Sequence, residues 1–583
     1  MPYKMTNKEV VLKLKEVLAA MEVKNLDRFR VRAYQIAISS IDGLTSSVYD
    51  LWENGKLDEI PGVGASLNQH LDELFATGKA KQFDAVMKDL PEGMFSLIGI
   101  RGVGAKTAFK LATAFKLNKR DTAIEKAKKA AESGKIRVLA GFGEKSEKDI
   151  LESIENLKKT KQESSRMLLY QAEEIANRIL EYMNKFEEVK DIKALGSLRR
   201  RASTVGDMDI AVATNKPKEV TDLFLKFPEI DEILDKGEKK CRVTLKNGVQ
   251  VDFRVIDQLS FGAMIQYFTG SKQHNVILRT HALSIGMSLS EYGIKTGDKQ
   301  EVFSNEDDFY KRIGLQYIPP EIRHGKEEVE LAARGKIPRL VELSDIRGDV
   351  HTHTIASDGV NSIKDMVNAG IDLGYSYIGI CDHSPSVQSR GKYEVLGLMQ
   401  ATRTTIEQIN DSQDIIRVLF GYEVNILSDG TLSMPNEMLK KLDYCVASIH
   451  TSFDQDRDVV TKRMLLTLEN PYVTVIGHPS GRLINQREAC NLDWEKVFES
   501  AIKNNKILEI NAQPSRLDLA DDLVADAVKK GIRLMINTDA HSTGDLKLMK
   551  YGIDVARRGM CTKENLLNTL SRKDFVDNFV KEV

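Results

Sequence analysis

Two acidic side chains near the middle of the chain, Asp207 and Asp209, precede four apolar residues that predict a buried strand. Side chains two positions apart on a strand point to the same face, so both carboxylates are expected to project together. Like charges held this close repel unless a cation lies between them, and Mg²⁺ prefers carboxylate oxygens together with substrate phosphates. The spacing therefore predicts a divalent-metal site, with an acidic turn beside a basic surface patch as the alternative.

A small-residue turn and three consecutive arginines lie just upstream of this acidic pair. Gly196 and Ser197 can offer a backbone N–H and a hydroxyl to a phosphate. Arg199 and Arg200 can add charge-assisted hydrogen bonds. Asp252 lies in a second strand-like run and, beside the first strand, would complete a cluster of three carboxylates able to hold two metal ions. A phosphate-binding turn next to such a cluster indicates phosphoryl or nucleotidyl transfer.

These motifs resemble those of the family X DNA polymerases, over roughly residues 1–318. Residues 196–209 are similar to the family's nucleotidyltransferase signature, and the Tyr-Phe-Thr-Gly-Ser run at 267–271 is similar to its motif beside the incoming sugar. The resemblance implies that the catalytic metal ligands are Asp207, Asp209 and Asp252, with Mg²⁺ or Mn²⁺ as the cofactor. It also implies a nucleotide site formed by Ser197, Arg200, Tyr267, Phe268, Gly270, Asn275 and Arg279.

Glycine turns punctuate an N-terminal third that reads as mostly helical. The runs at 60–65 and 100–107 each place a Gly-Val-Gly turn directly before a predicted helix, whose free N–H groups favour a phosphate. Both fit the helix-hairpin-helix pattern, which grips the DNA backbone without reading its sequence. The DNA-binding residues predicted here are Gly62, Gly64, Gly102, Gly104 and Lys106.

One position in this region departs from the family pattern. Family members that remove a 5′-deoxyribose phosphate use a lysine that forms a Schiff base, and His70 stands at that position here. Imidazole cannot form this imine, and nearby Lys79 is better suited to pairing with a phosphate. The lyase activity of those relatives is therefore not carried over to this chain.

Beyond residue 346, strand-like runs alternate with helical ones, which predicts a parallel, barrel-like domain. Six of the ten histidines of the chain and three carboxylates follow the ends of these strands, where α/β barrels place their chemistry. A single histidine there would more often be structural, but a set of this size predicts a metal cluster. Its members are His351, His353, Asp358, His383, Glu423, His450, His478, Asp539 and His541.

This set resembles the PHP (polymerase and histidinol phosphatase) domain, with all nine ligand positions present. Nine mixed nitrogen and oxygen ligands can hold about three transition metals, and imidazole with carboxylate suits Mn²⁺, Zn²⁺ or Fe²⁺. Such a cluster generates hydroxide near neutral pH and clamps a phosphate ester. Because a domain kept only as a scaffold would be expected to lose ligands, the complete set predicts an active phosphoesterase.

The length of 583 residues predicts several domains, since single cores rarely exceed about 250–300 residues. The expected fold combines helical helix-hairpin-helix domains, an α+β nucleotidyltransferase palm with a thumb, and a distorted (β/α) barrel. The expected limits are 1–84 and 85–165 for the two helical domains (the second fingers-like), 166–258 for the palm, 259–318 for the thumb, 319–345 for a linker and 346–583 for the PHP domain.

Composition adds expectations about location and partners. The net charge of −1 gives no global case for nucleic-acid binding, so that prediction rests on the motifs alone. Without a long apolar run, a signal-like N-terminus or a Cys-x-x-Cys pair, the sequence predicts a cytoplasmic protein that does not contact membranes. We expect a monomer whose partners are gapped or primed duplex DNA and dNTPs.

The function predicted from these features is a DNA polymerase that fills short gaps during DNA repair by two-metal nucleotidyl transfer. Its PHP domain would act as a 3′–5′ exonuclease or phosphodiesterase. One alternative is a DNA-binding, metal-dependent nuclease with weak polymerase activity, including cleavage at abasic sites. A second alternative is a small-molecule phosphatase, although that activity would need neither the hairpins nor the nucleotide motif.

Overall fold

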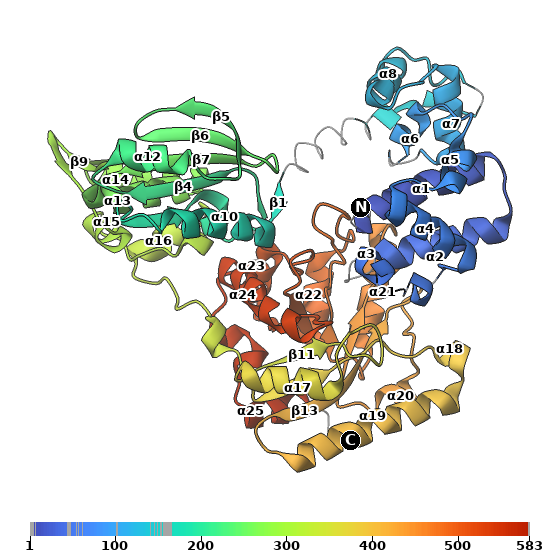
Figure 1. The fold of residues 1–583 in the computed structure, drawn as a ribbon. Coiled ribbons are helices and arrows are strands. Elements are labelled where there is room, and N and C mark those ends of the chain that lie inside the picture. The colour runs from blue at the N-terminus through green and yellow to red at the C-terminus, as the bar shows by residue number, and fades with distance from the viewer. Residues whose placement is uncertain are drawn as a thin grey trace. The chain divides into compact units, whose positions relative to one another are not determined.

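A computed structural model gives the fold of the chain (Figure 1). It describes residues 5, 7–42, 48–53, 55, 57–60, 62–98, 100, 103–139, 141–144, 146–148, 150–151, 154 and 166–580. The chain divides into two compact units, Met1–Ser164 and Ser165–Val583. The finer domain limits expected from the sequence stay predictions.

The first unit is built from helices whose apolar faces meet in one core. In α1 (Asn7–Val23), Val10, Leu14 and Val17 are fully buried, because a spacing of three to four residues places them on one helix face. The helices that follow are α2 (Arg28–Asp42), α3 (Val48–Glu53), α4 (Ala65–Thr77), α5 (Lys81–Met87), α6 (Gly93–Leu97), α7 (Ala105–Ala114) and α8 (Arg120–Glu132). The predicted helical N-terminal region is confirmed.

The second unit contains a five-stranded sheet in the order β2-β4-β7-β6-β5. Its strands are β2 (Asp191–Ala194), β4 (Met208–Ala213), β5 (Ile230–Lys236), β6 (Lys240–Leu245) and β7 (Gln250–Ile256). On one face, Phe253 of β7 stacks on Phe224 of α12 (Pro217–Phe224) with ring centroids 4.0 Å apart, and α10 (Leu169–Met183) joins the same core. Alternate residues of β7, among them Asp252, point to the other face.

A smaller α+β segment follows this sheet in the chain. Its elements are α13 (Phe261–Thr269), α14 (Lys272–Ser284), β8 (Met287–Ser290), β9 (Gly293–Thr296), β10 (Lys299–Glu301), α15 (Glu306–Arg312) and α16 (Glu328–Ala333). Strands β8, β9 and β10 form an antiparallel sheet. Buried Arg323 and Glu306 form an ion pair of 2.7 Å within this segment, and Arg199 of the palm joins it to the palm by hydrogen bonds to Glu306 and to Ile265 O of α13. The α+β architecture expected for a palm and thumb is confirmed.

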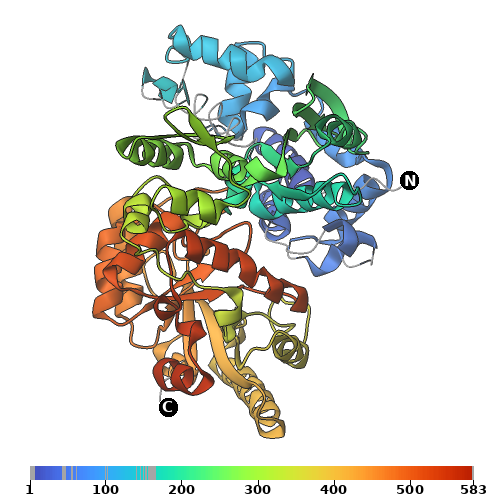
Figure 2. The same ribbon diagram turned by 90° about the vertical axis from the view of Figure 1, so that its left-hand side faces the viewer.

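The C-terminal part is a parallel sheet of seven strands that pair in chain order. Figure 2 shows this part of the chain in yellow to red. They are β11 (Gly348–Thr352), β12 (Tyr377–Ile380), β13 (Arg417–Asn425), β14 (Tyr444–Ser448), β15 (Val475–Ile476), β16 (Ile507–Asn511) and β17 (Arg533–Asn537). Hydrogen bonds from His353 N to Ala540 O and from Ala540 N to His351 O link the first strand to the segment after the last one. The sheet therefore curls into the nearly closed barrel that the sequence predicts.

Helices alternate with these strands and cover the barrel. They include α17 (Ile363–Asp372), α19 (Lys392–Ser412), α21 (Arg457–Glu469), α22 (Trp494–Lys503), α23 (Asp521–Lys530), α24 (Met549–Arg558) and α25 (Arg572–Phe579). Tyr377 inside the barrel stacks on Phe575 of α25 with ring centroids 3.8 Å apart. One end of the barrel is thus filled with aromatic side chains, which leaves the carboxyl ends of the strands for polar residues.

Two further facts bear on the expectations above. Among the described residues, no helix is long and apolar enough to cross a membrane. All five cysteines are buried and form no disulfide.

Candidate nucleotide and metal sites

The three predicted acids meet at one edge of the palm sheet. Strands β4 and β7 are parallel neighbours, and their register places Asp209 directly opposite Asp252. Asp207 immediately precedes β4 and is exposed. The two strands are therefore neighbours in the sheet, as the sequence led us to expect.

Electrostatics in this acidic cluster favour a cation. Burial and the neighbouring charge of Asp207 raise the pKa of Asp209 to about 6. Arg242 offsets part of the charge by binding both oxygens of Asp252, at 2.6 and 2.9 Å, and Arg254 lies 3.9 Å from Asp209. Burial is the larger cause of the raised pKa and repulsion from Asp207 adds to it; a hard divalent ion with oxygen ligands would relieve that repulsion.

A cavity of about 480 Å³ adjoins the acids. It is lined by Arg166, Gly196, Ser197, Arg200, Asp207, Asp209, Tyr267, Phe268, Gly270, Lys272, Asn275, Val276 and Arg279. Every residue predicted to bind the nucleotide is among them. The cavity therefore has hydrogen-bond donors for a phosphate at the turn, carboxylates beside them, and two aromatic rings.

Local structure explains how the turn at 196 reaches the acids. Gly196 has a φ of +60°, and a Cβ atom there would lie 2.9 Å from Oδ2 of Asp209. Any other residue would be strained and would displace the carboxylate. Arg200 Nη1 donates a hydrogen bond to Thr269 O, which holds the guanidinium against α13.

The three consecutive arginines separate into three environments. Arg199 does not line the cavity, although the sequence pattern favoured it as a hydrogen-bond donor to a phosphate. It forms an ion pair with buried Glu306 instead. Arg200 faces the cavity, where burial and neighbouring arginines lower its pKa to about 10. Arg201 forms ion pairs with Glu173 and Asp554. Only the middle arginine is thus free to meet a phosphate.

Sequence reasoning missed two arginines at this site. Arg166 lines the cavity and is fixed by hydrogen bonds to Thr204, but no local pattern links it to a motif thirty residues later. Arg254 follows Asp252 by two residues, so strand alternation already places it on the same face of β7, and only its role in the site was not predicted. Its guanidinium lies 4.0 Å from the ring centroid of Phe268.

The predicted DNA-binding glycines lie at the starts of helices in the first unit. Gly64 and Gly104 are the N-cap residues of α4 and α7, and no atom lies within 4 Å of an ideal Cβ on either one. Gly62 packs on α2 so closely that a Cβ would lie 2.5 Å from Ala37 N. Lys106 donates a hydrogen bond of 3.0 Å to Asn25. Gly102 lies outside the described residues.

His70 is half-buried on α4, 3.4 Å from the hydroxyl of Tyr34. Burial and Arg30 lower its pKa below the ordinary value for histidine. A neutral imidazole in this position fits a structural role. The absence of a Schiff-base amine at residue 70 stays the basis of the prediction made above.

The nine predicted metal ligands converge at the carboxyl ends of the barrel strands. Glu423 of β13 is the centre, with five imidazole nitrogens 3.0–3.8 Å from its oxygens: those of His351, His353, His383, His450 and His478. Asp539 lies 3.1 Å from His353, and Asp358 lies 3.2 Å from His541. The structure therefore joins residues that are up to 190 positions apart in the chain.

The donor groups of this cluster fit transition metals. Potential ligand atoms fall into three groups: His353, Asp358, His383 and His541; His351, His353 and Asp539; and His383, Glu423 and His450. Buried ring nitrogens of His351, His353 and His478 have no hydrogen-bond partner among the described residues. Although burial opposes it, the surrounding histidines hold the pKa of Glu423 well below its usual range. Unpartnered imidazole nitrogens around ionised carboxylates are the ligands that Mn²⁺, Zn²⁺ and Fe²⁺ favour.

A buried carboxylate that sequence reasoning missed supports the cluster from outside. Glu509 of β16 accepts hydrogen bonds from His351 Nδ1 and from the backbone N–H of His478, both at 2.7 Å. The bond to Nδ1 fixes the tautomer that presents Nε2 of His351 to the cluster. The signal was present in the sequence as one charged residue inside an otherwise apolar strand. Asn425 orients His450 Nδ1 in the same way, at 2.6 Å.

Comparisons with known proteins agree with this geometry. Residues 5–80 match the helix-hairpin-helix domain, residues 264–324 the DNA polymerase beta thumb, and residues 349–513 the PHP domain. The fold and the two sites thus define a DNA polymerase fused to a PHP domain.

A full-length relative places the chain more closely. It is 36% identical over 582 residues to the DNA polymerase/3′-5′ exonuclease PolX of Bacillus subtilis (strain 168), a match that covers 99% of this chain and 100% of the relative. The chain belongs to the family X DNA polymerases that carry a PHP domain. Its C-terminal part alone is 30% identical over 232 residues to a probable phosphatase of Thermoanaerobacter sp. (strain X514), covering 38% of this chain and 89% of that protein.

Proposed function

We propose that this protein is a DNA polymerase that extends a 3′-hydroxyl with dNTPs in short gaps, and that its PHP domain removes nucleotides from 3′ ends. The observation that carries the polymerase is the cavity in which Ser197 and Arg200 face Asp207 and Asp209. A phosphate-binding turn beside two carboxylates is the arrangement that a dNTP with its metal ion requires.

Each residue of the cavity has a role in this proposal. Asp207, Asp209 and Asp252 would hold two Mg²⁺ or Mn²⁺ ions, which when bound lower the barrier to attack on the α-phosphate. Ser197 and Arg200 bind the triphosphate. Tyr267 and Phe268 lie against the sugar, and Asn275 and Arg279 lie beside the nascent base pair. These last two are fixed in place, since Asn275 donates to Tyr267 O at 2.7 Å and Arg279 lies 5.3 Å from the Tyr267 ring.

The PHP cluster supports hydrolysis of phosphodiesters. The nine ligands would hold about three transition metals, which supply a hydroxide near neutral pH when bound. Mn²⁺ is the expected ion, because Mg²⁺ prefers oxygen-rich octahedral sites over histidine clusters. Glu509 and Asn425 keep His351 and His450 in orientations that can bind a metal. The B. subtilis relative is named a 3′-5′ exonuclease, which supports that polarity.

Binding of gapped or primed duplex DNA is assigned to the helix-hairpin-helix turns. The open N-caps at Gly64 and Gly104 leave room for a phosphate to approach backbone N–H groups. Lys106 adds a positive charge on the first turn of α7. A role in DNA repair in the cytoplasm, as a monomer, completes the proposal.

A hydrolytic enzyme without polymerase activity is the second candidate, and the likeness of the C-terminal part to a probable phosphatase favours it. A phosphatase activity alone would not explain the nucleotide cavity or the helical unit, because the likeness covers only the C-terminal part of the chain. A nuclease with weak polymerase activity, including one that cuts at abasic sites, keeps the DNA-binding unit and differs only in the rate of dNTP incorporation.

A labelled primer in a short gap, incubated with the purified protein with and without dNTPs, separates these functions. The proposed enzyme lengthens the primer to fill the gap with dNTPs and shortens it from the 3′ end without them. Shortening under both conditions would support the nuclease, and no change in the primer together with release of phosphate from a monoester would support the phosphatase.

A further inference from the structure

Side chains of the C-terminal barrel domain donate hydrogen bonds to backbone carbonyls of residues that line the nucleotide cavity. Arg558 Nη1, at the end of α24, donates a hydrogen bond of 2.8 Å to Arg200 O. Asn485 Nδ2 donates a hydrogen bond of 2.8 Å to Arg166 O. Both acceptors belong to arginines that line the cavity. The backbone carbonyls of two cavity residues are therefore hydrogen-bonded by the barrel domain.

The strongest of these contacts is made to the residue after Arg200. Asp554 of α24 accepts a hydrogen bond from Arg201 Nε at 2.8 Å, and the same carboxylate oxygen forms an ion pair with Nη2 at 2.7 Å. Arg201 has a φ of +55°, which an L residue rarely adopts. The side chain that follows from this backbone conformation is held by Asp554 and by Glu173, which lies 2.8 Å from Arg201 Nη1.

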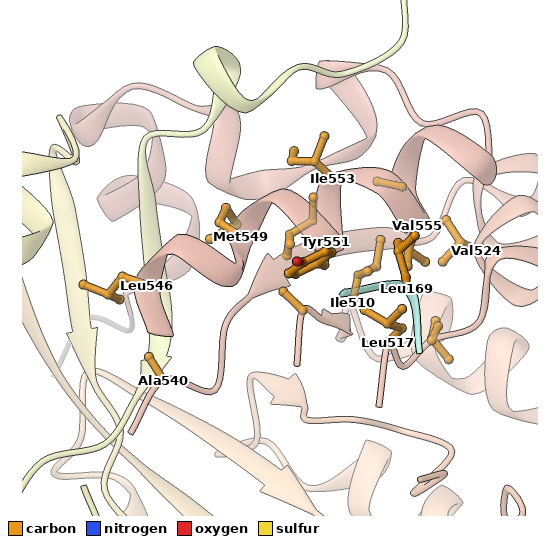
Figure 3. Close-up of a cluster of buried hydrophobic side chains, with 14 of the residues drawn as sticks. Leu169, Ile510, Leu517, Val524, Ala540, Leu546, Met549, Tyr551, Ile553 and Val555 are labelled. Carbon is orange, nitrogen blue, oxygen red and sulfur yellow. The ribbon is translucent and has the colours of Figure 1, made fainter. Parts of the chain in front are cut away.

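Helix α24 is itself held firmly. Arg558 is fixed by two hydrogen bonds to Asp521 at 2.6 and 2.9 Å, and Tyr551 donates one of 2.8 Å to Glu173. Its apolar face shares one hydrophobic cluster with the start of α10, where Leu169 lies beside Val555 (Figure 3). A rigid helix can transmit a fixed position to the turn that it contacts.

We propose that Asp554 and Arg558 are positioning residues for the triphosphate: they fix the turn at 196–201 so that the Arg200 guanidinium is aimed into the cavity before a nucleotide binds. This inference rests on the proposed polymerase function and extends it to residues of the other domain. Pre-set donors cost less on binding than donors that must be ordered by the ligand. The contribution is made to nucleotide binding, because neither residue lines the cavity.

The test is gap filling by Asp554→Asn in the full-length protein, with kcat and KM measured separately for dNTP and for gapped DNA. We expect KM for dNTP to rise about tenfold, with kcat changed less than about twofold and KM for DNA unchanged. Asp554→Glu keeps the charge and should restore most of the affinity. Exonuclease activity should stay at the level of the unsubstituted protein, because the metal ligands are untouched.

Arg557→Gln is the matched control. Arg557 lies on the same helix, but its partners are in the segment 319–345 that precedes the barrel: Glu321 at 2.9 Å and Val341 O at 3.0 Å. KM for dNTP should therefore stay unchanged in this variant. An equal rise in KM in both variants would show that any weakening of the domain contact suffices, which overturns the specific role of Asp554.

A second variant guards against misfolding. If Asp554→Asn lowers the unfolding temperature strongly, Asn485→Ala tests the same idea through Arg166, with an expected rise in KM for dNTP of about threefold. A value of KM equal to that of the unsubstituted protein in every well-folded variant overturns the proposal. Failure of the proposed function is a different result, since the unsubstituted protein would then incorporate no dNTP.

Discussion

The acids of the nucleotide cavity and the histidines at the barrel end would both hold divalent cations, with very different amounts of protein around them. Asp207 is exposed, and the cavity at this edge of the palm sheet is open to a substrate. In the barrel, His351, His353 and Glu423 are buried, and a further carboxylate supports the cluster from behind. The first site supplies three carboxylates, whereas the second supplies nine ligands.

This difference indicates which groups fill the coordination positions of the metal ions at each site. Three carboxylates leave most coordination positions of two ions to substrate oxygens, so ions at the palm are expected to bind together with the nucleotide. In the barrel cluster, protein side chains fill most coordination positions of the metal ions, so these ions are expected to stay bound between turnovers. The four predictions below test this contrast, beginning with the largest effect.

Replacement of a central histidine should break the barrel site alone. His353→Ala removes a buried ligand that lies 3.1 Å from Asp539, so the metal content of the purified protein should fall and exonuclease activity should be lost. Gap filling should stay within about twofold of the unsubstituted rate. Metal analysis and both assays check this, with His281→Ala, a thumb histidine that pairs with Ile313 O, as the control. Full exonuclease activity in His353→Ala would place the hydrolytic site elsewhere.

Replacement of a palm acid should break the other site. Asp209→Asn keeps the shape of the side chain but removes the charge at the strand position opposite Asp252, and gap filling should fall by roughly 100-fold or more. The 3′–5′ exonuclease should survive, and so should the metal content of the purified protein. Asp222→Asn, on the exposed side of α12 and paired with Lys236, is the matched control. Equal loss of both activities in Asp209→Asn would contradict the assignment of two sites.

The supporting carboxylate should have a smaller effect than a ligand. Glu509→Gln keeps the size of the side chain but loses the charge that orients His351, so affinity for Mn²⁺ should fall by about 10–100-fold. Titration of the metal-free protein with Mn²⁺ measures this, with exposed Glu495→Gln as the control. An unchanged affinity would mean that Glu509 serves only the packing of the barrel.

Competition between protons and Mg²⁺ at Asp209 should give the smallest of the four effects. The pKa of Asp209 is raised to about 6 by burial and by Asp207, so below that pH the carboxyl is protonated and cannot bind a cation. At limiting Mg²⁺ the rate of gap filling should therefore fall as pH drops through about 6, and saturating Mg²⁺ should move this midpoint down by about one pH unit. A midpoint that does not respond to the Mg²⁺ concentration would show that another group controls it.

Local patterns were enough to predict most of the ligands. Asp207 and Asp209 could be paired because a strand fixes the direction of side chains two apart, and His478 could be found because it lies two residues after the end of a strand. The partners of these residues were harder. Arg201 and Asp554 are 353 positions apart, and the ion pair between them leaves no trace in either local sequence. Glu509 was visible as a charge in an apolar strand, but its role depends on how the barrel closes.

The same limit explains Arg199. The local pattern after the glycine turn offers Arg199 and Arg200 equally as hydrogen-bond donors to a phosphate, because the sequence does not say which way each side chain points. The turn aims Arg199 at buried Glu306 and Arg201 at another domain. The family resemblance singled out Arg200, and tertiary packing supplies the physical reason, because Arg200 lines the cavity whereas Arg199 and Arg201 are held in ion pairs.

The contact between α24 and the palm has a consequence for engineering. Two activities joined in one chain invite the removal of one half by truncation, at a site such as the segment 319–345. Here that cut would uncover Leu169 and leave the Arg201 guanidinium without Asp554, directly beside the nucleotide pocket. A stand-alone polymerase half would need an apolar-to-polar exchange at Leu169 and a new acid to replace Asp554, because the partner domain is part of its scaffold.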